Sequence, residues 1–359
     1  MVKSTQVNIT PHNIFVIKLR HHGDMILTTP VINSLHERYP NASIDVLLYK
    51  ETRPILEAHP AIRCLHVIDR TWKQEGHWRK LRYEYALLAS VRASCYDVVV
   101  NLADQWRSAL ITLFSGASLR IGFAFDKRKS IFWRLCHNYL VPTDNHRHLH
   151  TVEQNMTALA PFGISPNVAR PSMHFSETDA QKVDILLLKQ RVTSNFIIFH
   201  PTARWEFKCW EDEKVATTID QLAHTGRKVI LTSAPERYEL EMIARIQSLC
   251  TTPNLISLAG QLSLPQLAAL IIRARLFIGV DSAPMHMSAA LGIPCIALLG
   301  PTKLQFWRPW GGEDNRVIWA GDYGPLPDPD SIDTNTRQRY LSAIPVKDVV
   351  EIAKKVLND

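Results

Sequence analysis

A polar turn between two apolar runs is the part of the chain best suited to hold an anion. Residues 276–280 (LFIGV) and 295–299 (CIALL) are short apolar runs typical of buried parallel strands. After the first run, a turn leads into small residues that fit a short helix, with Pro284 in its first turn. Such a helix points free backbone N–H groups out of the carboxyl edge of a sheet. We therefore expect a phosphate site here, whose donors are the N–H groups after Asp281 together with Ser282 and His286.

Two further loops at the same predicted sheet edge carry polar groups. One contains Thr202 and Lys208, a lysine set among apolar neighbours; the other contains Glu236. A nucleotide diphosphate-sugar needs donors and positive charge for its diphosphate, and an acceptor for its ribose hydroxyls. Thr202 and Lys208 suit the first task, and Glu236, with Glu239 as the alternative, suits the second. Each residue also has a common structural role, because a Ser or Thr after a strand often caps a helix and a His among apolar residues often belongs to the core.

Asp24 is the candidate base in the N-terminal half. It follows the first predicted strand, residues 14–19, and precedes the helix that we expect over residues 25–38. A carboxylate at this edge of a sheet can take a proton from an attacking hydroxyl. An Asp before a helix can equally be its cap, and both roles stay open at this point. The competing bases are His21 and His22.

The elements that must position these residues form two α/β domains. A chain of 359 residues exceeds one typical core, and apolar runs alternate with helical patterns in both halves. We predict an N-terminal Rossmann-like domain over residues 1–170 and a C-terminal one over residues 171–359, with their carboxyl edges facing across a cleft. Residues 163–175 suit a linker, and Ser176 suits the cap of the next helix. Strands are expected over residues 14–19, 44–49, 64–68, 97–101 and 120–123, and over residues 196–200, 228–232, 255–258, 276–280, 295–299 and 316–319.

The net charge of +7 is divided unevenly between the two halves. Residues 1–175 hold 21 Lys and Arg against 13 Asp and Glu, whereas residues 176–359 hold 20 against 21. The first half should therefore meet something anionic: nucleic acid, a membrane surface or a phosphorylated substrate. Residues 70–85 and 126–139 combine bases with aromatics, which fits the margin of a membrane or an anionic glycolipid. The alternative is a solvated helix face whose aromatics belong to the core.

Several classes of protein are disfavoured. No apolar run is long enough for a membrane-spanning helix, and residues 1–11 are polar and lack the apolar stretch of a secretory leader. Six scattered cysteines without a CxxC pair predict reduced thiols in the cytoplasm. No GxGxxG follows the first strand, so a dinucleotide cofactor is not expected. Alternating His146, His148 and His150 make a poor metal site without further ligands, and we expect neither metal nor cofactor.

Four segments together resemble a known family, the ADP-heptose:lipopolysaccharide heptosyltransferases of glycosyltransferase family nine. The segments are KLRHHGDMILTTPVI at 18–32, HPTA at 200–203 with KCW at 208–210, VDSAPMHMSAALGIP at 280–294 and LLGPT at 298–302. They cover nearly the whole chain in the right order. The resemblance implies an α/β fold of the GT-B type, an N-terminal domain that binds the acceptor and a C-terminal domain that binds ADP-heptose. It also implies a cytoplasmic enzyme, peripheral on the cytoplasmic face of the inner membrane, with no nucleic-acid partner.

The resemblance further implies a single inverting transfer of L-glycero-D-manno-heptose to the phosphorylated lipopolysaccharide inner core, as the branching third heptose on the second. Asp24 occupies the position of the family's base, and Lys208 that of the lysine that holds the donor phosphates. Ala203 stands where the family has a second hydroxyl. The remaining donor residues implied are Thr202, Glu236, Leu262 beside the adenine, Asp281, Ser282, Ala283 and His286. Next to Asp24, we expect Arg20, His21 and His22 to bind the acceptor.

Three other functions remain compatible with the sequence. One is a family member with a different acceptor position or donor. Another is a sugar-nucleotide epimerase, because such enzymes share the two-domain architecture. The third is a non-catalytic chain that binds anionic glycolipid or nucleic acid through its basic first half.

Overall fold

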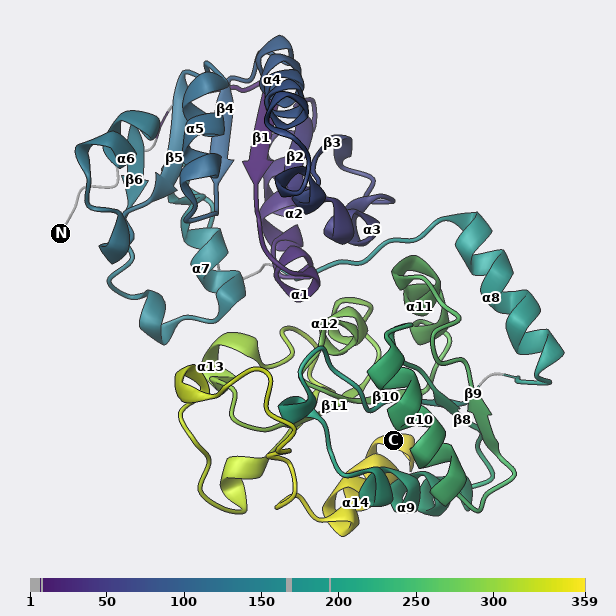
Figure 1. Ribbon diagram of the computed structural model, residues 1–359. Helices are drawn as coiled ribbons and strands as arrows, with labels where there is room; N and C mark the ends of the chain where they lie inside the picture. The colour runs from purple at the N-terminus through teal and green to yellow at the C-terminus, as the bar shows by residue number, and fades with distance from the viewer. Residues whose placement is uncertain (1–6, 8, 166–169, 194, 359) are drawn as a thin grey trace. The chain divides into compact units, whose positions relative to one another are not determined.

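The computed structural model describes residues 7, 9–165, 170–193 and 195–358, which form two compact units, Met1–His174 and Phe175–Asp359 (Figure 1). The structure thus divides the chain after His174, whereas the sequence predicted residue 170. Residues 1–6 and 8 of the polar N-terminal segment, and residues 166–169 of the predicted linker, lie outside the described part.

The first unit is a six-stranded parallel sheet with the strand order β3-β2-β1-β4-β5-β6. Its elements are β1 (Asn13–Ile17), α1 (His22–Ile26), α2 (Thr29–Arg38), β2 (Ser43–Tyr49), α3 (Arg53–Leu56), β3 (Ile62–Ile68), α4 (His77–Ala93), β4 (Val98–Asn101), α5 (Trp106–Phe114), β5 (Leu119–Phe123), α6 (Ile131–Cys136), β6 (Tyr139–Val141) and α7 (Thr151–Thr157).

The second unit is also a six-stranded parallel sheet, with the order β12-β11-β10-β7-β8-β9. Its elements are α8 (Glu177–Lys189), β7 (Ile197–His200), α9 (Asp212–Ala223), β8 (Val229–Leu231), α10 (Arg237–Leu249), β9 (Leu255–Ser257), α11 (Leu264–Ile271), β10 (Leu276–Val280), α12 (Ala283–Ala290), β11 (Cys295–Leu299), α13 (Leu304–Trp307), β12 (Arg316–Trp319) and α14 (Val346–Asn358).

Both sheets have the same topology when the strands are counted within their own unit. In each, the order is 3-2-1-4-5-6, the doubly wound arrangement of nucleotide-binding domains. The winding reverses between β1 and β4 in the first unit, and between β7 and β10 in the second. The loops at the carboxyl ends of these strands diverge, which makes them the expected place for a ligand.

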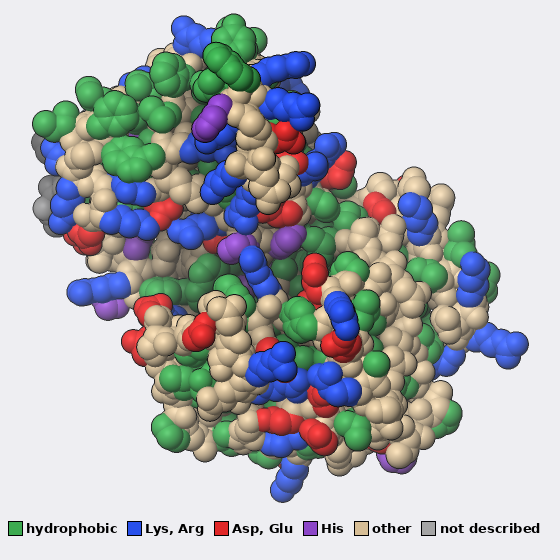
Figure 2. Space-filling view, in the orientation of Figure 1, with side chains coloured by type: hydrophobic (Ala, Val, Ile, Leu, Met, Phe, Trp, Pro, Cys, Tyr) green, Lys and Arg blue, Asp and Glu red, His purple; other side chains and the backbone are tan. Residues whose placement is uncertain are grey.

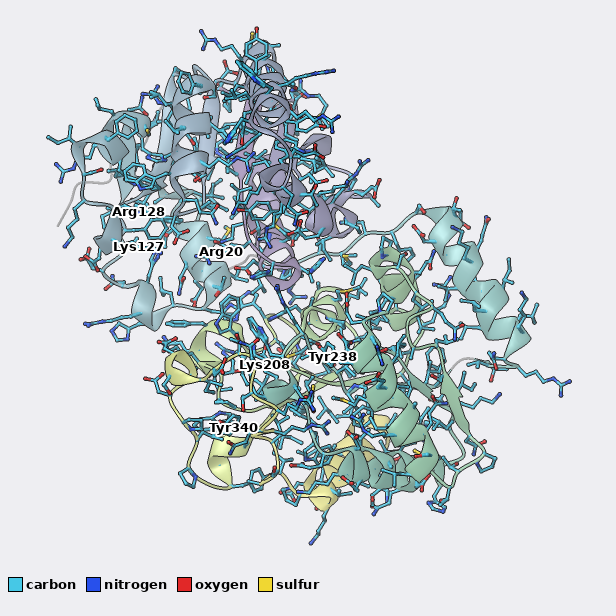
Figure 3. The ribbon with its side chains drawn as sticks, viewed as in Figure 1. Arg20, Lys127, Arg128, Lys208, Tyr238 and Tyr340 are labelled. Carbon is cyan, nitrogen blue, oxygen red and sulfur yellow. The ribbon has the colours of Figure 1, made fainter. Side chains whose placement is uncertain are left out.

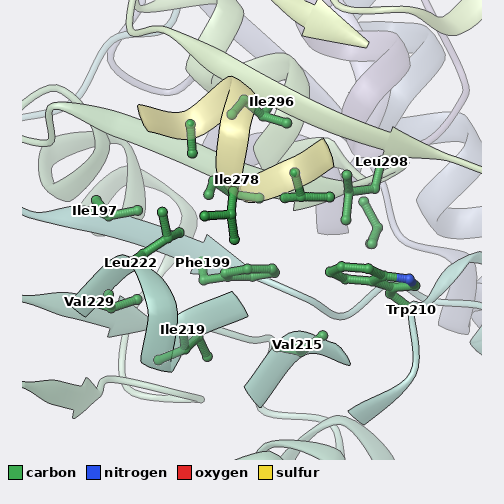
Figure 4. Packing of buried hydrophobic residues seen from close by; sticks show 14 of the residues in the cluster. Ile197, Phe199, Trp210, Val215, Ile219, Leu222, Val229, Ile278, Ile296 and Leu298 are labelled. Atoms are coloured by element: carbon green, nitrogen blue, oxygen red, sulfur yellow. The ribbon is translucent and has the colours of Figure 1, made fainter. Parts of the chain in front are cut away.

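Each unit has its own apolar core. In the first, Phe15 and Ile17 of β1 pack with Leu87 and Val91 of α4 and with Ile111 of α5. In the second, the central strands β7, β10 and β11 meet α9 in a fully buried cluster (Figure 4). Figure 4 shows this cluster around Phe199, Ile278 and Trp210. These cores hold the strands in place, so the loops at the strand ends can carry polar groups.

All eleven strands expected from the sequence are present, and Ser176 caps α8 by accepting a hydrogen bond from the Asp179 N–H at 3.1 Å. The short strand β6 was not predicted. The single helix expected over residues 25–38 was wrong, because it is divided into α1 and α2. Pro30 lacks an N–H group and its ring would collide with the carbonyl of Ile26 in a continuous helix.

Candidate active site

The loops after β7 and β10 bring Lys208 and Asp281 together where the second sheet reverses its winding. The Lys208 ammonium donates to Oδ2 of Asp281 at 2.6 Å, and the Thr302 hydroxyl donates to the same oxygen at 2.6 Å. Burial alone would raise the pKa of Asp281, but the charge and hydrogen bond of Lys208, with the bond from Thr302, lower it below its ordinary value. Asp281 is therefore an ionised, buried carboxylate that fixes the position of Lys208. Figure 3 shows where Lys208 lies in the second unit.

The N-terminus of α12 follows directly after Asp281. Ser282 is the N-cap residue, but its side chain makes no capping hydrogen bond, and its buried Oγ has no partner among the described residues. The first helical turn leaves the N–H groups of Ala283 and Met285 without partners inside the helix. His286, one turn along, is buried. A helix N-terminus with uncommitted donors and a lysine beside it is suited to bind phosphate oxygens.

Thr202 and Glu239 form a buried pair behind this edge. Thr202 is fully buried and its hydroxyl donates to Oε2 of Glu239 at 2.6 Å. The Ala234 N–H donates to the same oxygen at 3.0 Å, and the Tyr238 hydroxyl donates to Oε1 at 3.2 Å. Both oxygens of Glu239, the alternative ribose acceptor of the sequence analysis, are therefore engaged inside the unit. Thr202 likewise joins two loops rather than facing solvent.

Glu236 has a different environment from Glu239. It is exposed at the N-cap of α10 and makes no capping hydrogen bond with its side chain. The loop after β9, which carries the half-buried Leu262, rests on the Glu236 loop, because the Gly260 N–H donates to the Ser233 carbonyl at 3.1 Å. Gly260 has a φ of +67°, and a Cβ there would lie 2.9 Å from Leu240. Glu236 and Leu262 thus lie on neighbouring loops, one polar and one apolar.

Asp24 lies at the equivalent edge of the first unit. It is the third residue of α1 and is half-buried, and it forms a capping box with His21 at the start of this helix, so Asp24 does have a capping role, from inside the helix rather than before it. Its Oδ2 accepts from the His21 N–H at a long 3.4 Å. The His22 Nε2 donates to the Glu51 carbonyl at 2.8 Å, so this ring is committed to a neighbouring loop. Of the three candidate bases, Asp24 alone offers a carboxylate, and it lies at the winding reversal of the first sheet.

A group of three basic side chains surrounds Asp104 at the same edge. The Arg20 Nη2 donates to Oδ2 of Asp104 at 3.2 Å, and the Lys127 ammonium contacts the same oxygen. The Arg128 Nε donates to the Asp104 carbonyl at 2.7 Å (Figure 3). Burial alone would raise the pKa of Asp104, but the hydrogen bond and charge of Lys127 and the charge of Arg20 lower it below its ordinary value. One carboxylate among three cations leaves an excess of positive charge at this edge. Arg20 was predicted from the sequence, whereas Asp104, Lys127 and Arg128 were not; the base-rich run 126–139 was the available signal for the two bases.

Lys18 connects this edge with α7. It is buried, and its Nζ donates to Oδ1 of Asn155 at 2.9 Å. The Asn155 Nδ2 in turn donates to the Leu27 carbonyl at 3.0 Å, at the end of α1. Burial lowers the pKa of Lys18, while the charge of Asp24 opposes that change. The ammonium and Asn155 thus hold the helix that carries Asp24.

The histidine run has structural contacts of its own. The His146 Nε2 lies 3.0 Å from the Thr157 hydroxyl, His148 accepts from the Arg147 Nε at 2.9 Å, and the His150 Nδ1 accepts from the Val152 N–H at 3.2 Å. In the part of the chain that the structure describes, no three His, Cys, Asp or Glu side chains are placed to share a metal ion. Nor is any described helix both long and apolar enough to span a membrane.

Comparison with known sequences identifies the family. Residues 85–337 match the sequence profile of glycosyltransferase family 9 (heptosyltransferase). The chain is 41% identical over 341 residues to lipopolysaccharide heptosyltransferase 3 of Escherichia coli, covering 94% of this chain and 97% of the relative. It is 39% identical over 339 residues to the protein of the same name from strain K12, covering 94% and 96%.

Solved structures agree in fold. The glycosyl transferase family 9 protein from Veillonella parvula superposes with a TM-score of 0.81 at 22% identity, covering 97% of each chain. The Escherichia coli ADP-heptose lps heptosyltransferase II gives 0.74 at 24% identity, covering 96% of this chain and 98% of that one. These neighbours confirm the GT-B fold. With that fold and this sequence identity, the chain belongs to glycosyltransferase family 9 and is a heptosyltransferase.

Proposed function

We propose that the chain transfers L-glycero-D-manno-heptose from ADP-heptose to the lipopolysaccharide inner core, as the branching third heptose on the second. The names of the relatives that are 41% and 39% identical support this acceptor. The observation that carries the donor half is the Lys208–Asp281 pair at the N-terminus of α12. An epimerase shares only the architecture and has no comparable sequence support.

The second unit is the donor side of this proposal. The diphosphate would lie against the N-terminus of α12, near Ser282, with Lys208 turning from Asp281 toward a phosphate oxygen. Glu236 is exposed and can accept hydrogen bonds from ribose hydroxyls, and Leu262 on the neighbouring loop provides apolar surface for the adenine. Thr202 and Glu239 hold these loops together from behind.

Asp24 is the base of the proposed reaction. Its carboxylate takes the proton from the acceptor hydroxyl, whose oxygen bonds to the anomeric carbon of the heptosyl group while the bond from that carbon to the phosphate oxygen breaks. The configuration inverts in this single displacement. ADP leaves with the extra negative charge, which Lys208 and the N–H groups of α12 stabilise.

Replacement of Asp24 tests the assignment of the base. Asp24→Asn keeps the shape and the hydrogen bond from the His21 N–H but cannot take a proton. We expect turnover to fall by about 10²- to 10⁴-fold with ADP affinity unchanged, measured by ADP release and by calorimetry. Near-normal turnover of a folded variant would remove Asp24 as the base and move the role to His21 or His22.

The first unit is the acceptor side of this proposal. The enzyme would work in the cytoplasm, at the cytoplasmic face of the inner membrane. Arg20, Lys127 and Arg128 around Asp104 supply excess positive charge for the phosphates of a lipopolysaccharide core. His21 is exposed beside Asp24, where it can contact the acceptor sugar.

A further inference from the structure

The outer surface of the first unit carries most of the exposed large apolar side chains. Of sixteen such residues in the described chain, nine lie on three helices, α4, α5 and α6. They are Trp78, Leu81 and Tyr85 on α4, Trp106, Leu110 and Phe114 on α5, and Ile131, Phe132 and Leu135 on α6. The other seven are distributed over the second unit. In Figure 2, green side chains gather over the part of the first unit where these helices lie in Figure 1.

The spacing of these residues shows that they form stripes opposite the buried faces of their helices. On α4 the exposed positions 78, 81 and 85 share one face, while Leu87 and Val91 point into the core. On α6, Ile131, Phe132 and Leu135 are exposed by 76%, 47% and 59%, while Trp133 and Cys136 are fully buried. A helix with a second apolar face toward solvent needs a partner, since an ordinary surface helix is polar there.

The stripes of α5 and α6 form one continuous surface. The Trp106 ring contacts the Phe132 ring, with their centroids 5.8 Å apart, and also the buried Trp133 at 5.6 Å. α4 lies beside α5, where the Arg107 Nη2 is 2.7 Å from Oε1 of Glu84. We call the nine side chains on these three helices the outer apolar face.

Basic residues accompany the outer apolar face. The segments 77–93, 106–114 and 126–136 contain nine Lys and Arg against two Asp and Glu. The bases include Lys129, which precedes the exposed residues of α6, and Arg134, which lies between Phe132 and Leu135. Exposed aromatic and aliphatic side chains with bases beside them match the boundary of an anionic bilayer, where the apolar groups enter the acyl region and the bases meet lipid phosphates.

We propose that the outer apolar face binds the surface of an anionic phospholipid membrane, with α6 inserting Ile131, Phe132 and Leu135. The proposal rests on the proposed function, in which the acceptor is held in a membrane. The charge argues against a second copy of this chain as the occupant. A two-fold interface would place the same basic segments against each other, which costs free energy unless acidic groups intervene.

Vesicle flotation of the full chain tests the proposal. The probes are vesicles of phosphatidylcholine alone and of phosphatidylcholine with phosphatidylglycerol in equal parts. We expect the wild type to float with the anionic vesicles and to stay behind with the neutral ones. The variant Ile131→Ser/Phe132→Ser/Leu135→Ser should bind anionic vesicles about tenfold more weakly or worse, because it lacks the inserted apolar groups. Lys129→Glu/Arg134→Glu should lose binding by a similar factor, and added salt should lower the wild-type binding.

The matched control is Ile185→Ser/Leu188→Ser on α8. These side chains are exposed by 52% and 78%, as on α6, but belong to the second unit. This variant should float like the wild type. ADP affinity and transfer to a lipid-free core oligosaccharide should be unchanged in the α6 variant, and these two measurements test the proposed function separately from the membrane surface.

Three outcomes would overturn the proposal: equal flotation of the α6 variant and the wild type, equal wild-type binding to neutral and anionic vesicles, or no binding to either. If the wild type does not float but forms dimers that Phe132→Ser disrupts, the outer apolar face is an interface between copies. A wild type that floats but transfers no heptose would leave the membrane surface standing and contradict the proposed function.

Discussion

Lys208 and Asp281 are coupled so tightly that their contributions to folding and to donor binding must be separated. Lys208→Met leaves the buried Asp281 carboxylate with Thr302 as its remaining hydrogen-bond donor among those that the structure shows. We expect the free energy of unfolding to fall by about 3 kcal/mol, because a buried charge loses its counterion. ADP affinity should fall by about tenfold to a hundredfold with the loss of the ammonium. Urea unfolding and calorimetry measure the two effects.

The double variant Lys208→Met/Asp281→Asn separates the two contributions. It removes both charges, so unfolding stability should recover most of the loss, while ADP affinity stays low. Recovery of ADP affinity together with stability would show that Lys208 supports only the fold of this edge.

At the scale of single residues, the sequence indicated which residues belong to the site better than it indicated which side chains contact one another. Asp24 and Asp281 could be named because each follows an apolar run that predicts a strand end, and Lys208 because it is a lysine among apolar neighbours in a loop beyond such a run. Thr202 donates a hydrogen bond to Glu239, 37 positions further along the chain. This contact depends on how two distant loops pack, which a local sequence pattern does not show. Asp104 was missed for the same reason, since its basic partners come from other loops.

At the scale of elements, the turn that carries Lys208 depends on a distant loop. The Arg339 Nη2 donates to Oε1 of Glu206 at 3.2 Å, and its Nη1 donates to the Trp210 carbonyl at 3.0 Å and to Oδ1 of Asp212 at 2.6 Å. The residue after it, Tyr340, donates its N–H to the Phe207 carbonyl at 3.3 Å. Arg339 therefore joins Glu206, the first residue of the turn Glu206–Lys208, to Trp210 and Asp212 beyond it, and acts as a positioning residue.

Arg339→Gln should loosen that turn without removing Lys208. We expect the KM for the donor to rise by about tenfold with a smaller change in kcat, because Lys208 loses its fixed position before the donor binds. The matched control is Arg245→Gln, since Arg245 also donates to Asp212, at 2.7 Å, but among the described residues it shows no hydrogen bond to Glu206 or to the Trp210 carbonyl. Equal effects of the two variants on the donor KM would mean that only the charge balance of Asp212 matters.

Elements with a strong local pattern were predicted, and those that depend on competition between neighbours were not. The long apolar strands were clear from their runs, whereas β6 has only three residues at the sheet edge. The break between α1 and α2 is stabilised by side chains as well as by Pro30. The Thr28 hydroxyl donates to the Asp24 carbonyl at 2.8 Å, and the Thr29 hydroxyl donates to the Ile26 carbonyl at 2.7 Å. These side-chain bonds occupy carbonyls that would accept backbone N–H groups in a continuous helix. The spacing of apolar residues does not reveal such a break.

At the scale of the whole molecule, two units of one topology differ in charge, the first being basic and the second nearly neutral. Counting residues was enough to assign the positive charge to the first half. Counting could not show that apolar side chains of the first unit are exposed on α4, α5 and α6. A helical pattern distinguishes the two faces of a helix, but it does not show which face packs against the sheet and which is exposed. The sequence left the alternative that the aromatics belong to the core, and the structure shows both: Trp133 is buried and Trp78 is exposed.

Separate cores also predict separate responses to acid. Burial, with His174 and His36 nearby, lowers the pKa of His59 in the first unit to about 4, and burial lowers that of His200 in the second unit to about 4. Both folded-state values lie below the ordinary 6.5, so the unfolded chain takes up protons first as the pH falls. Each histidine therefore contributes stability that is complete above about pH 6.5 and is lost toward pH 4, on the order of 3 kcal/mol per group.

Single replacements should remove this acid sensitivity from one unit at a time. His59→Asn keeps an acceptor for the Ala61 N–H, which His59 now binds at 3.3 Å, but it cannot be protonated in this range. Hydrogen exchange of peptides from β1 and from β10, followed by mass spectrometry at about pH 7 and about pH 5, reports the two units separately. In the wild type, protection should fall in both; in His59→Asn, the fall in β1 should shrink while that in β10 persists, and His200→Asn should do the reverse. If protection in β1 falls as much in His59→Asn as in the wild type, another group governs the acid response of the first unit; if either replacement changes both units alike, the two cores do not unfold independently.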